Sequence, residues 1–175
     1  MPAFTQRAPE HDVVVAADRS GVFAAHLPYQ TWDPRPVAGS AGLVPESWHP
    51  AHEAWGATQW QTRFEEQANR TAWDEDYQVW MALRVLGEAA TRTNGGDYAA
   101  IREWVFSDQF DLAAFKGQKL TFRDWDRQLR QPVLLTAGTV VASVSPQAEF
   151  LHQVSQLDTL GIDRSESACT IGENQ

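Results

Sequence analysis

The segment from Asp74 to Thr93 constrains the fold more than any other part of the chain. Its apolar residues recur with the period of an α-helix and cover much of the circumference, which predicts a long and largely buried helix. They are Tyr77, Val79, Trp80, Ala82, Leu83, Leu86 and Ala90. Asn94, Gly95 and Gly96 then accept the left-handed backbone that ends a helix. Other elements of the chain are therefore expected to cover this helix.

Two further helices are expected, one before and one after it. Ser47 is a capping residue for a helix over about Pro50–Asn69, whose first turn holds a proline. Asp97 is a capping residue for a short helix over Tyr98–Ser107. The apolar faces comprise Trp55, Trp60 and Phe64 in the first helix and Ile101, Trp104 and Val105 in the second. Their spacing places each set on one side of its helix.

Short apolar runs near the start of the chain predict strands. Val13–Asp18 is continuous rather than alternating, which is typical of a strand buried on both faces of a parallel sheet. Arg19–Gly42 is rich in proline and glycine, so we expect a loop with at most a helical turn around Val22–Leu27. Gly42–Pro45 is a candidate short strand, which its proline would end.

The pattern changes after Phe110. Leu120–Arg123 alternates between apolar and polar residues, and the Asp-Trp-Asp sequence over Asp124–Asp126 is typical of a turn. Gln131–Thr136 and Val140–Val144 are further strand candidates, and a glycine separates them. These segments predict an antiparallel hairpin or a small meander.

The tail that follows Ser145 has only weak periodicity. Four apolar residues are expected to pack on the body of the protein: Phe150, Leu151, Leu157 and Leu160. From Ser165 onward we expect little regular structure. The chain as a whole is therefore predicted to be an α/β protein with three helices and a C-terminal antiparallel hairpin.

Composition excludes several function classes. The 175 residues carry 14 basic and 23 acidic side chains, so the net charge is −9, and nucleic acid is not an expected partner. No apolar run reaches the roughly 18 residues of a membrane span, so we do not expect an integral membrane protein. Cys169 is the single cysteine, which excludes an internal disulfide and a multi-cysteine zinc site. Most of the 8 tryptophans must anchor a core or a cleft.

The first predicted strand leads into residues that could contact a ligand. Asp18 and Arg19 can pair with an ammonium or a carboxylate group, although an exposed turn pair is the plainer interpretation. Phe23 and Tyr29 follow in the loop, where an aromatic ring either stacks on a ligand or seals the local core. Trp32 is expected to seal that core.

His49, His52 and Glu53 are the candidate residues for a metal site. Spacing of three residues can place two imidazoles on one helical face, but Pro50 lies between them and no further ligand is implied. A pair of surface histidines is the preferred interpretation, and a metal-dependent enzyme is the alternative. The chain has no nucleophile elbow, phosphate-binding glycine loop or zinc-protease motif, and Cys169 has no nearby histidine. We therefore expect no catalytic residues, no cofactor and no metal.

The order of these elements resembles that of a known family. Strand, loop, strand, two long helices, short helix and closing hairpin follow one another as in the C-terminal half of type I periplasmic solute-binding proteins, the branched-chain amino-acid-binding class. Asp76–Ala90 resembles the long Tyr-rich helix of that class, and Phe115–Asp126 resembles its closing segment. A subgroup is more similar still, namely the substrate-binding proteins of ABC transporters found beside PQQ-dependent alcohol dehydrogenase systems. The segments that carry this similarity are Val13–Asp18, Pro34–Pro45, Leu129–Pro132, Ser143–Gln147, Leu157–Gly161 and Ser167–Cys169.

The resemblance implies a function in transport rather than catalysis. It implies the solute-binding component of an ABC importer linked to PQQ-dependent alcohol oxidation, located in the periplasm, with a permease and an ATPase as partners. The ligand is expected to be either an alcohol-derived small acid or a metal or metal chelate that the dehydrogenase needs. In this interpretation the ligand-binding residues are Asp18, Arg19, Phe23 and Trp48, and Trp48 follows a hinge crossing at Leu43–Pro45.

The resemblance also implies an organisation in segments. It spans about residues 11–169 of this chain but only about half of the family's protein. Residues 1–46 would form a strand and loop segment of one lobe with a hinge crossing, 47–112 a helical segment of the other lobe, 113–145 the closing strands, and 146–175 the tail. The family's signal peptide and first lobe have no counterpart in this sequence, so a truncated C-terminal fragment is expected. The alternative is a stand-alone α/β interaction module that binds no small solute.

Overall fold

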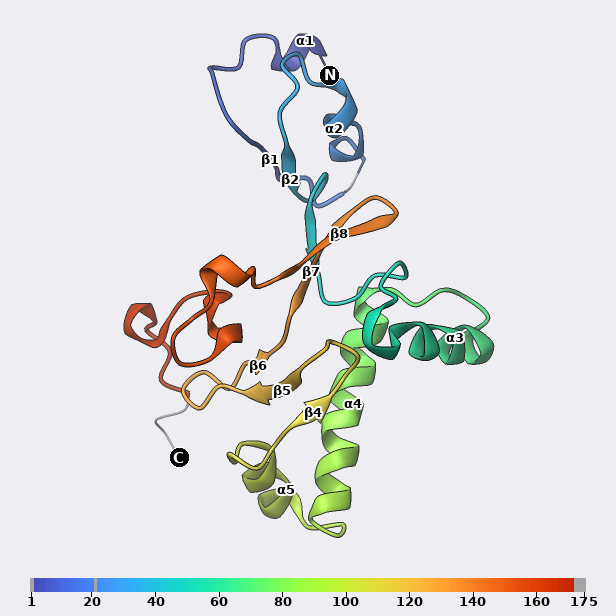
Figure 1. Cartoon of the computed structure of the whole chain (residues 1–175), viewed down its shortest axis with the longest axis vertical. Coiled ribbons are helices and arrows are strands. Elements are labelled where there is room, and N and C mark those ends of the chain that lie inside the picture. Colours follow the sequence, from blue (N-terminus) through green and yellow to red (C-terminus); the bar gives the residue numbers. More distant parts are fainter. Residues whose placement is uncertain (1, 21, 172–175) are drawn as a thin grey trace.

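Figure 1 shows the computed structural model of the protein, which describes residues 2–20 and 22–171. These residues form helices and three small sheets, so the predicted α/β class is confirmed. The N-terminal part, up to about residue 43, lies at one end of the molecule (Figure 1). The longest helix, α4, lies toward the opposite end, and the C-terminal tail lies to one side.

The N-terminal part is built on two paired strands. β1 (Val14–Ala16) and β2 (Val37–Gly39) run parallel, and the single turns α1 (Pro2–Thr5) and α2 (Leu27–Gln30) lie in the same part of the chain. Its small core consists of Ala16, Ala24, Val37 and Ala41. The predicted parallel strand is confirmed, but its predicted burial on both faces is wrong, because Val15 is 76% exposed. In a strand that packs on one small core, alternate side chains point away from that core.

The segment predicted as loop over Arg19–Gly42 contains more structure than expected. β2 lies within it, and a 3-10 turn over Ala24–His26 leads into α2 where a helical turn was predicted. Trp32 is 59% exposed, so the prediction that it seals the core is wrong. Small alanine and valine side chains fill this core instead.

A second sheet lies in the middle of the molecule (Figure 1). β3 (Val44–Glu46), β7 (Val133–Ala137) and β8 (Val140–Ser145) are antiparallel and lie in the order β3-β7-β8. A turn at Gly138, with φ of 63°, joins β7 to β8, which confirms the predicted hairpin. Pro45 lies within β3 and does not end it. β3 is an edge strand, where a residue without an N–H is tolerated.

α3 (Ala57–Ala68) begins well after the start predicted at Pro50. Trp55, with φ of 55°, and the residue after it adopt left-handed backbone conformations that interrupt a helix. Ser47 is therefore too far away to cap α3. Its N–H and its hydroxyl donate instead to the carboxylate of Asp74 at the start of α4.

α4 (Asp74–Arg92) is the long helix that the sequence predicts. It ends at Arg92, and Asn94 and Gly95, which follow, are left-handed with φ of 53° and 74°. α5 (Tyr98–Val105) follows, and the side chain of Asp97 caps it by accepting a hydrogen bond from the third residue of the helix. No helix in the described part of the chain is both long enough and apolar enough to cross a membrane.

α4 is buried on one side only, so its predicted burial over most of the circumference is wrong. The buried residues are Tyr77, Met81, Val85 and Ala89. Val79, Leu83 and Leu86, which we call the outer face of α4, are 62%, 63% and 55% exposed. Their spacing of four and three residues places them on one stripe, opposite the buried side. The elements that contribute to the core all pack against the other side of the helix.

The third sheet lies beside α4 (Figure 1). β4 (Leu112–Ala113), β5 (Lys119–Phe122) and β6 (Leu129–Arg130) are antiparallel and follow one another in chain order. The predicted turn at Asp124–Asp126 joins β5 to β6. This sheet and the helices α3, α4 and α5 enclose the main core of the protein, which is rich in aromatic rings. Its large buried members are Trp48, Trp60, Tyr77, Phe110, Leu112 and Leu120.

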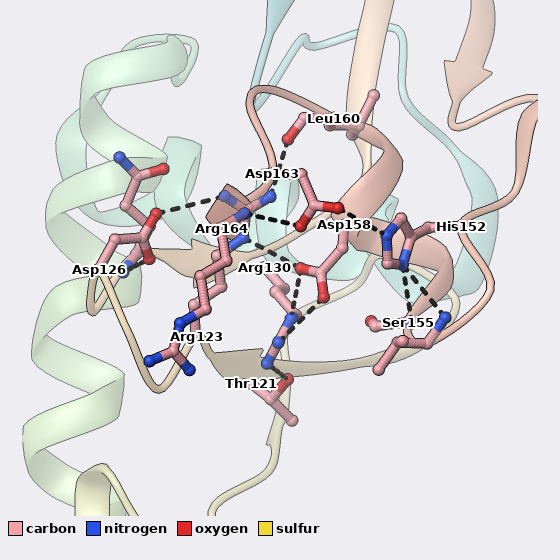
Figure 2. A network of polar contacts seen from close by, with 12 residues as sticks. Thr121, Arg123, Asp126, Arg130, His152, Ser155, Asp158, Leu160, Asp163 and Arg164 are labelled. Carbon is pink, nitrogen blue, oxygen red and sulfur yellow. Dashed lines mark hydrogen bonds and ion pairs between the residues drawn. The ribbon is translucent and has the colours of Figure 1, made fainter. Parts of the chain in front are cut away.

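A charged cluster anchors the tail to β5 and β6 (Figure 2). Asp158 accepts hydrogen bonds from Arg123 at 3.0 Å and from Arg130 at 2.7 and 3.0 Å, and we call these three residues the tail clamp. Arg123 is only 5% exposed and also donates to the main-chain oxygens of Leu160 and Ile162. Burial opposes ionisation of Asp158, but the hydrogen bonds from the two arginines outweigh it and lower its pKa. The tail is therefore fixed by buried ion pairs.

Apolar packing of the tail is weaker than predicted. Leu157 is 5% exposed, as expected, and Leu160 is half-buried. Phe150 and Leu151 are 69% and 41% exposed, so their predicted packing is wrong. The clamp holds the segment that follows them and leaves these two side chains in solvent. A 3-10 turn spans Arg164–Glu166, and residues 172–175 of the predicted loose end lie outside the described residues.

Candidate functional site

Three of the residues predicted to bind ligand, namely Asp18, Arg19 and Phe23, lie in the N-terminal part. Asp18 stabilises the local backbone there. Its carboxylate accepts hydrogen bonds from the N–H groups of Ser20, Phe23 and Ala24 at 2.8 to 3.0 Å. Bonds from the Ser20 hydroxyl and from these N–H groups hold the pKa of Asp18 well below its usual range. Arg19 and Phe23 are exposed. A ligand contact at these residues stays a prediction.

Trp48, the fourth predicted residue, lies in the main core and not with the other three. It is 1% exposed and stacks on Tyr77, with ring centroids 4.7 Å apart. Its indole N–H donates to Gln61 at 3.0 Å, and its ring contacts Trp60 edge-on at 4.6 Å. The structure therefore does not bring the four predicted residues together, and Trp48 contacts Trp60 within the core.

A groove beside α3 and α4 gathers aromatic and basic side chains at the surface. Its volume is about 470 Å³, and the strand β4 and the turn after it complete its lining. We call it the aromatic groove, and its principal residues are Trp60, Arg63, Phe64, Trp80, Arg84 and Phe115. Trp60 and Trp80 have ring centroids 5.4 Å apart, and Trp80 lies 5.7 Å from Phe115. The rings thus form a continuous apolar floor.

The helical repeat places these side chains on the same side of each helix. In α3, Trp60, Arg63 and Phe64 are three and four residues apart, so they share one face. In α4, Trp80 and Arg84 are four residues apart and share a face in the same way. Each helix therefore presents an aromatic platform with one arginine beside it.

The charge of the groove is opposite to that of the whole chain. Arg63 forms no ion pair with any residue that the structure describes, and the carboxylate paired with Arg84 is that of Glu88, at 3.9 Å. Glu88 is held more closely by Arg92, at 2.9 Å. The lining contains no acidic residue, although the chain has a net charge of −9. Two loosely held guanidinium groups in the same groove as four aromatic rings favour an anion that has an apolar body.

A second pocket of about 460 Å³ adjoins the groove. The two share Ala113 and Phe115 in their linings. We call it the side pocket, and its remaining principal residues are Trp55, Lys116, Gly117, Gln118 and Lys119. The only two lysines of the chain lie here. Lys119 is 73% exposed at its side chain and forms an ion pair with Asp111.

Lys116 carries its ammonium group into the core and away from the side pocket. It donates to the main-chain oxygens of Ser47 and Pro132, and Nζ lies 5.1 Å from the ring centroid of Tyr77. Burial lowers the pKa of Lys116 to about 8, although the negative charge of Asp74 opposes this shift. Lys116 therefore joins three segments of the chain. Its ammonium group does not contact a ligand in the side pocket.

The two histidines of the candidate metal motif have other partners. The ring of His49 accepts a hydrogen bond from the N–H of Ala51, and its Nε2 lies 3.2 Å from the oxygen of Gly138. Nε2 of His52 lies 3.1 Å from the oxygen of Phe115, and His52 is 3% exposed. The prediction of a surface pair is therefore wrong for His52, and burial lowers its pKa. The described residues contain no group of three side chains placed to hold a metal ion.

The aromatic groove offers binding groups rather than reactive ones. Its lining holds aromatic rings, two guanidinium groups, a glutamine and an alanine, with no serine, cysteine or histidine among them. A carboxylate can accept two parallel hydrogen bonds from one guanidinium group. The apolar part of the same molecule can then cover the rings and leave water.

Neither Arg63 nor Arg84 was among the predicted site residues. Trp60 and Phe64 were predicted as one apolar stripe, and Trp80 as a buried residue of the long helix. The sequence pattern that indicates the groove is the position of Arg63 beside two aromatic residues on the same helical face. This pattern does not show that α4 brings Arg84 to the same groove.

No family model matches this chain, and neither does any curated protein or solved structure. The aromatic groove is therefore the basis for a functional proposal.

Proposed function

We propose that this protein binds a small solute, and that the solute is an organic acid held in the aromatic groove. The observation that carries the proposal is the lining of the groove. Two arginines and four aromatic rings line it together, with no acidic residue among them, in a chain whose net charge is −9. Such a site matches a carboxylate attached to an apolar body.

The proposal extends to a role in transport. The chain would be the solute-binding component of a periplasmic ABC importer linked to PQQ-dependent alcohol oxidation, and a portion of a two-lobe fold. Its partners would be a membrane permease and an ATPase. The support is the family resemblance of the sequence, together with the parallel pair β1–β2, the helices α3 to α5 and the hairpin β7–β8 in the expected order.

Of the two expected ligand classes, the groove favours the alcohol-derived acid. Oxidation of a primary alcohol yields a carboxylic acid that keeps the apolar chain of the alcohol. Its carboxylate fits Arg63 and Arg84, and its chain fits the ring floor. A free metal cation would instead be repelled by both arginines.

Thermal unfolding in the presence of hexanoate tests the proposal. A ligand that binds only the native state raises Tm, and at 100 times its Kd it adds about 2.7 kcal/mol of stability. We expect hexanoate to raise Tm and hexylamine, which has the opposite charge, to leave it unchanged. Replacement of either groove arginine, in Arg63→Ala or Arg84→Ala, should abolish the shift.

Arg19→Ala is the matched control, because Arg19 is exposed and belongs to the site that the sequence predicts. The proposal predicts that this variant keeps the full hexanoate shift. Loss of the shift in Arg19→Ala, with no effect of Arg63→Ala, would move the site to the N-terminal part. A wild-type protein that responds to no organic acid would overturn the proposal.

The outer face of α4 supports a second candidate function, an interaction module that binds no small solute. Its three exposed apolar residues, Val79, Leu83 and Leu86, form a stripe with no element of the described chain packed on it. Exposed apolar stripes of this kind are typical of protein interfaces. The hexanoate experiment separates the two candidates, since the module predicts no shift.

A further inference from the structure

We infer that the aromatic groove and the side pocket form one two-part site, selective for an acid whose carboxylate and aromatic ring are joined by a short chain. Trp55 is the residue that selects the ring. This inference rests on the proposed function and adds the class of acid to it. Four observations carry it: the residues that the two pockets share, the charge of each pocket, the exposure of Trp55 and the way its ring is held.

The two pockets adjoin at their shared residues. Ala113 and Phe115 line both of them, so the arginine end and the Trp55 end meet at this segment. Each pocket has a volume of more than 400 Å³, which is more than a carboxylate alone requires. A ligand bound at Arg63 or Arg84 can therefore extend across Phe115 into the side pocket.

The charges differ at the two ends, which favours one carboxylate rather than two. The groove has Arg63 with no ion-pair partner among the described residues and Arg84 with a loose one. In the side pocket, Lys116 directs its ammonium group into the core, and Lys119 is paired with Asp111. The free positive charge is thus confined to the groove, and the far end of the ligand should be neutral.

Trp55 offers an aromatic face at that neutral end. A methyl group at Gly117 would lie less than 3.0 Å from each of the three indole atoms Cε2, Cδ2 and Cζ2. Because these atoms are nearly equidistant from that point, one face of the indole must rest on the glycine. The side chain belongs to a residue that is 53% exposed. More than half of the residue therefore remains open to solvent, where its indole can stack on a planar ring.

The backbone holds Trp55 in this position at a cost. Trp55 and Phe115 have φ of 55° and 59°, values that bulky L-residues rarely adopt. Such strain persists only where the surroundings enforce it, and it is concentrated at binding and catalytic sites. His52 links the two strained segments, because its ring lies 5.6 Å from that of Trp55 and its Nε2 lies 3.1 Å from the oxygen of Phe115.

Isothermal titration calorimetry with two acids of the same length tests the inference. 4-Phenylbutyrate and 4-cyclohexylbutyrate carry the same carboxylate and linker, and only the first has a planar aromatic ring. Ring stacking of the usual strength predicts about two- to tenfold tighter binding of 4-phenylbutyrate to the wild-type protein. Trp55→Leu should remove this preference while binding of 4-cyclohexylbutyrate stays within about twofold.

Two further variants control for damage to the fold. Trp55→Phe keeps an aromatic face and should keep the preference. Trp73→Leu removes another half-exposed tryptophan, 57% exposed and absent from the linings of both pockets, and should change neither affinity. Arg63→Ala should weaken both acids equally, because both carry the carboxylate.

The outcomes distinguish this inference from the proposed function. Equal binding of the two acids by the wild-type protein, with loss of both in Arg63→Ala, would overturn the ring selectivity and keep the acid site. A preference that survives Trp55→Leu would also overturn the inference, since another residue would then select the ring. Failure of both acids to bind the wild-type protein would overturn the proposed function itself.

Discussion

The buried ammonium group of Lys116 makes the stability of the protein change with pH in the alkaline range. Its pKa is about 8 in the folded protein and its ordinary value is 10.5, so between these values the unfolded state binds more protons. Stability should therefore rise with pH in this window, by at most about 1.4 kcal/mol per pH unit. Urea unfolding from pH 7 to 10 measures the slope, and Lys116→Met should remove it.

Lys119→Met is the matched control for this prediction, because Lys119 is the other lysine of the chain and is exposed. This variant should keep the wild-type slope. Burial also raises the pKa of Tyr77 above its ordinary value of 10.0, so ionisation of this tyrosine in the unfolded state lowers stability near pH 10, and the slope is therefore read between pH 8 and 9. Parallel curves for wild type and Lys116→Met would contradict the burial of the ammonium group.

Gly117 is required by both its backbone and its neighbour. It has φ of 77°, which costs an alanine about 1–2 kcal/mol, and the indole of Trp55 occupies the space that a side chain would take. Gly138 has a similar φ of 63°, but no heavy atom lies within 4 Å of the place that its Cβ atom would occupy. Gly117→Ala should therefore destabilise the protein by about 1–3 kcal/mol more than Gly138→Ala, measured by urea unfolding. Equal losses would show that Trp55 does not rest on Gly117.

Among the elements, the tail is joined to the third sheet through the carboxylate of Asp158. Asp158→Ala would leave Arg130, whose side chain is 18% exposed, without its ion-pair partner, while Arg123 keeps Asp126 at 3.2 Å. Removal of one partner from a buried ion pair costs about 3–5 kcal/mol. We expect a loss of this order in urea unfolding and faster proteolytic cleavage after residue 145, measured by mass spectrometry.

Asp163→Ala provides the comparison, because the side chain of Asp163 is 52% exposed, contacts His152 at 3.4 Å and caps the 3-10 turn by accepting from the N–H of Arg164. Its loss should cost about 0.5–2 kcal/mol, the usual effect of removing such a cap. If the two variants were equally stable, the tail clamp would not be what holds the tail.

The bounds of an element can be predicted from the sequence when the residues that determine them are close by in the chain. The ends of α4 and α5 were predicted well, since local residues such as Asn94 and Asp97 determine them. The start of α3 was predicted too early. A tertiary contact with Gly117 holds Trp55 in a left-handed conformation that tryptophan disfavours. The groove escaped prediction for a related reason, as Arg63 and Arg84 meet only when two helices pack.

At the scale of the whole molecule, apolar side chains remain exposed on two separate elements. Val15 on β1 is 76% exposed, and the outer face of α4 is more than half exposed. A two-stranded parallel pair with one open face is also unusual, because parallel sheets are normally covered on both sides. These surfaces agree with the proposal that the chain is a portion of a larger fold.

This exposure predicts that the isolated chain associates with itself. Sedimentation velocity should show a concentration-dependent mass, and a hydrophobic dye should bind. The double variant Leu83→Gln, Leu86→Gln should reduce both effects without loss of stability, since neither residue contributes to the core. A cooperative wild-type monomer that binds no dye would count against the fragment proposal.

The location of the bound acid decides between the aromatic groove and the N-terminal part. The indole N–H groups of the 8 tryptophans give separate NMR signals once assigned. On titration with 4-phenylbutyrate, the proposed site predicts that the signals of Trp55 and Trp80 shift while that of Trp32 stays fixed. Shifts at Trp32 and at the amides of Asp18 and Phe23, with none at Trp80, would place the ligand in the N-terminal part and contradict it.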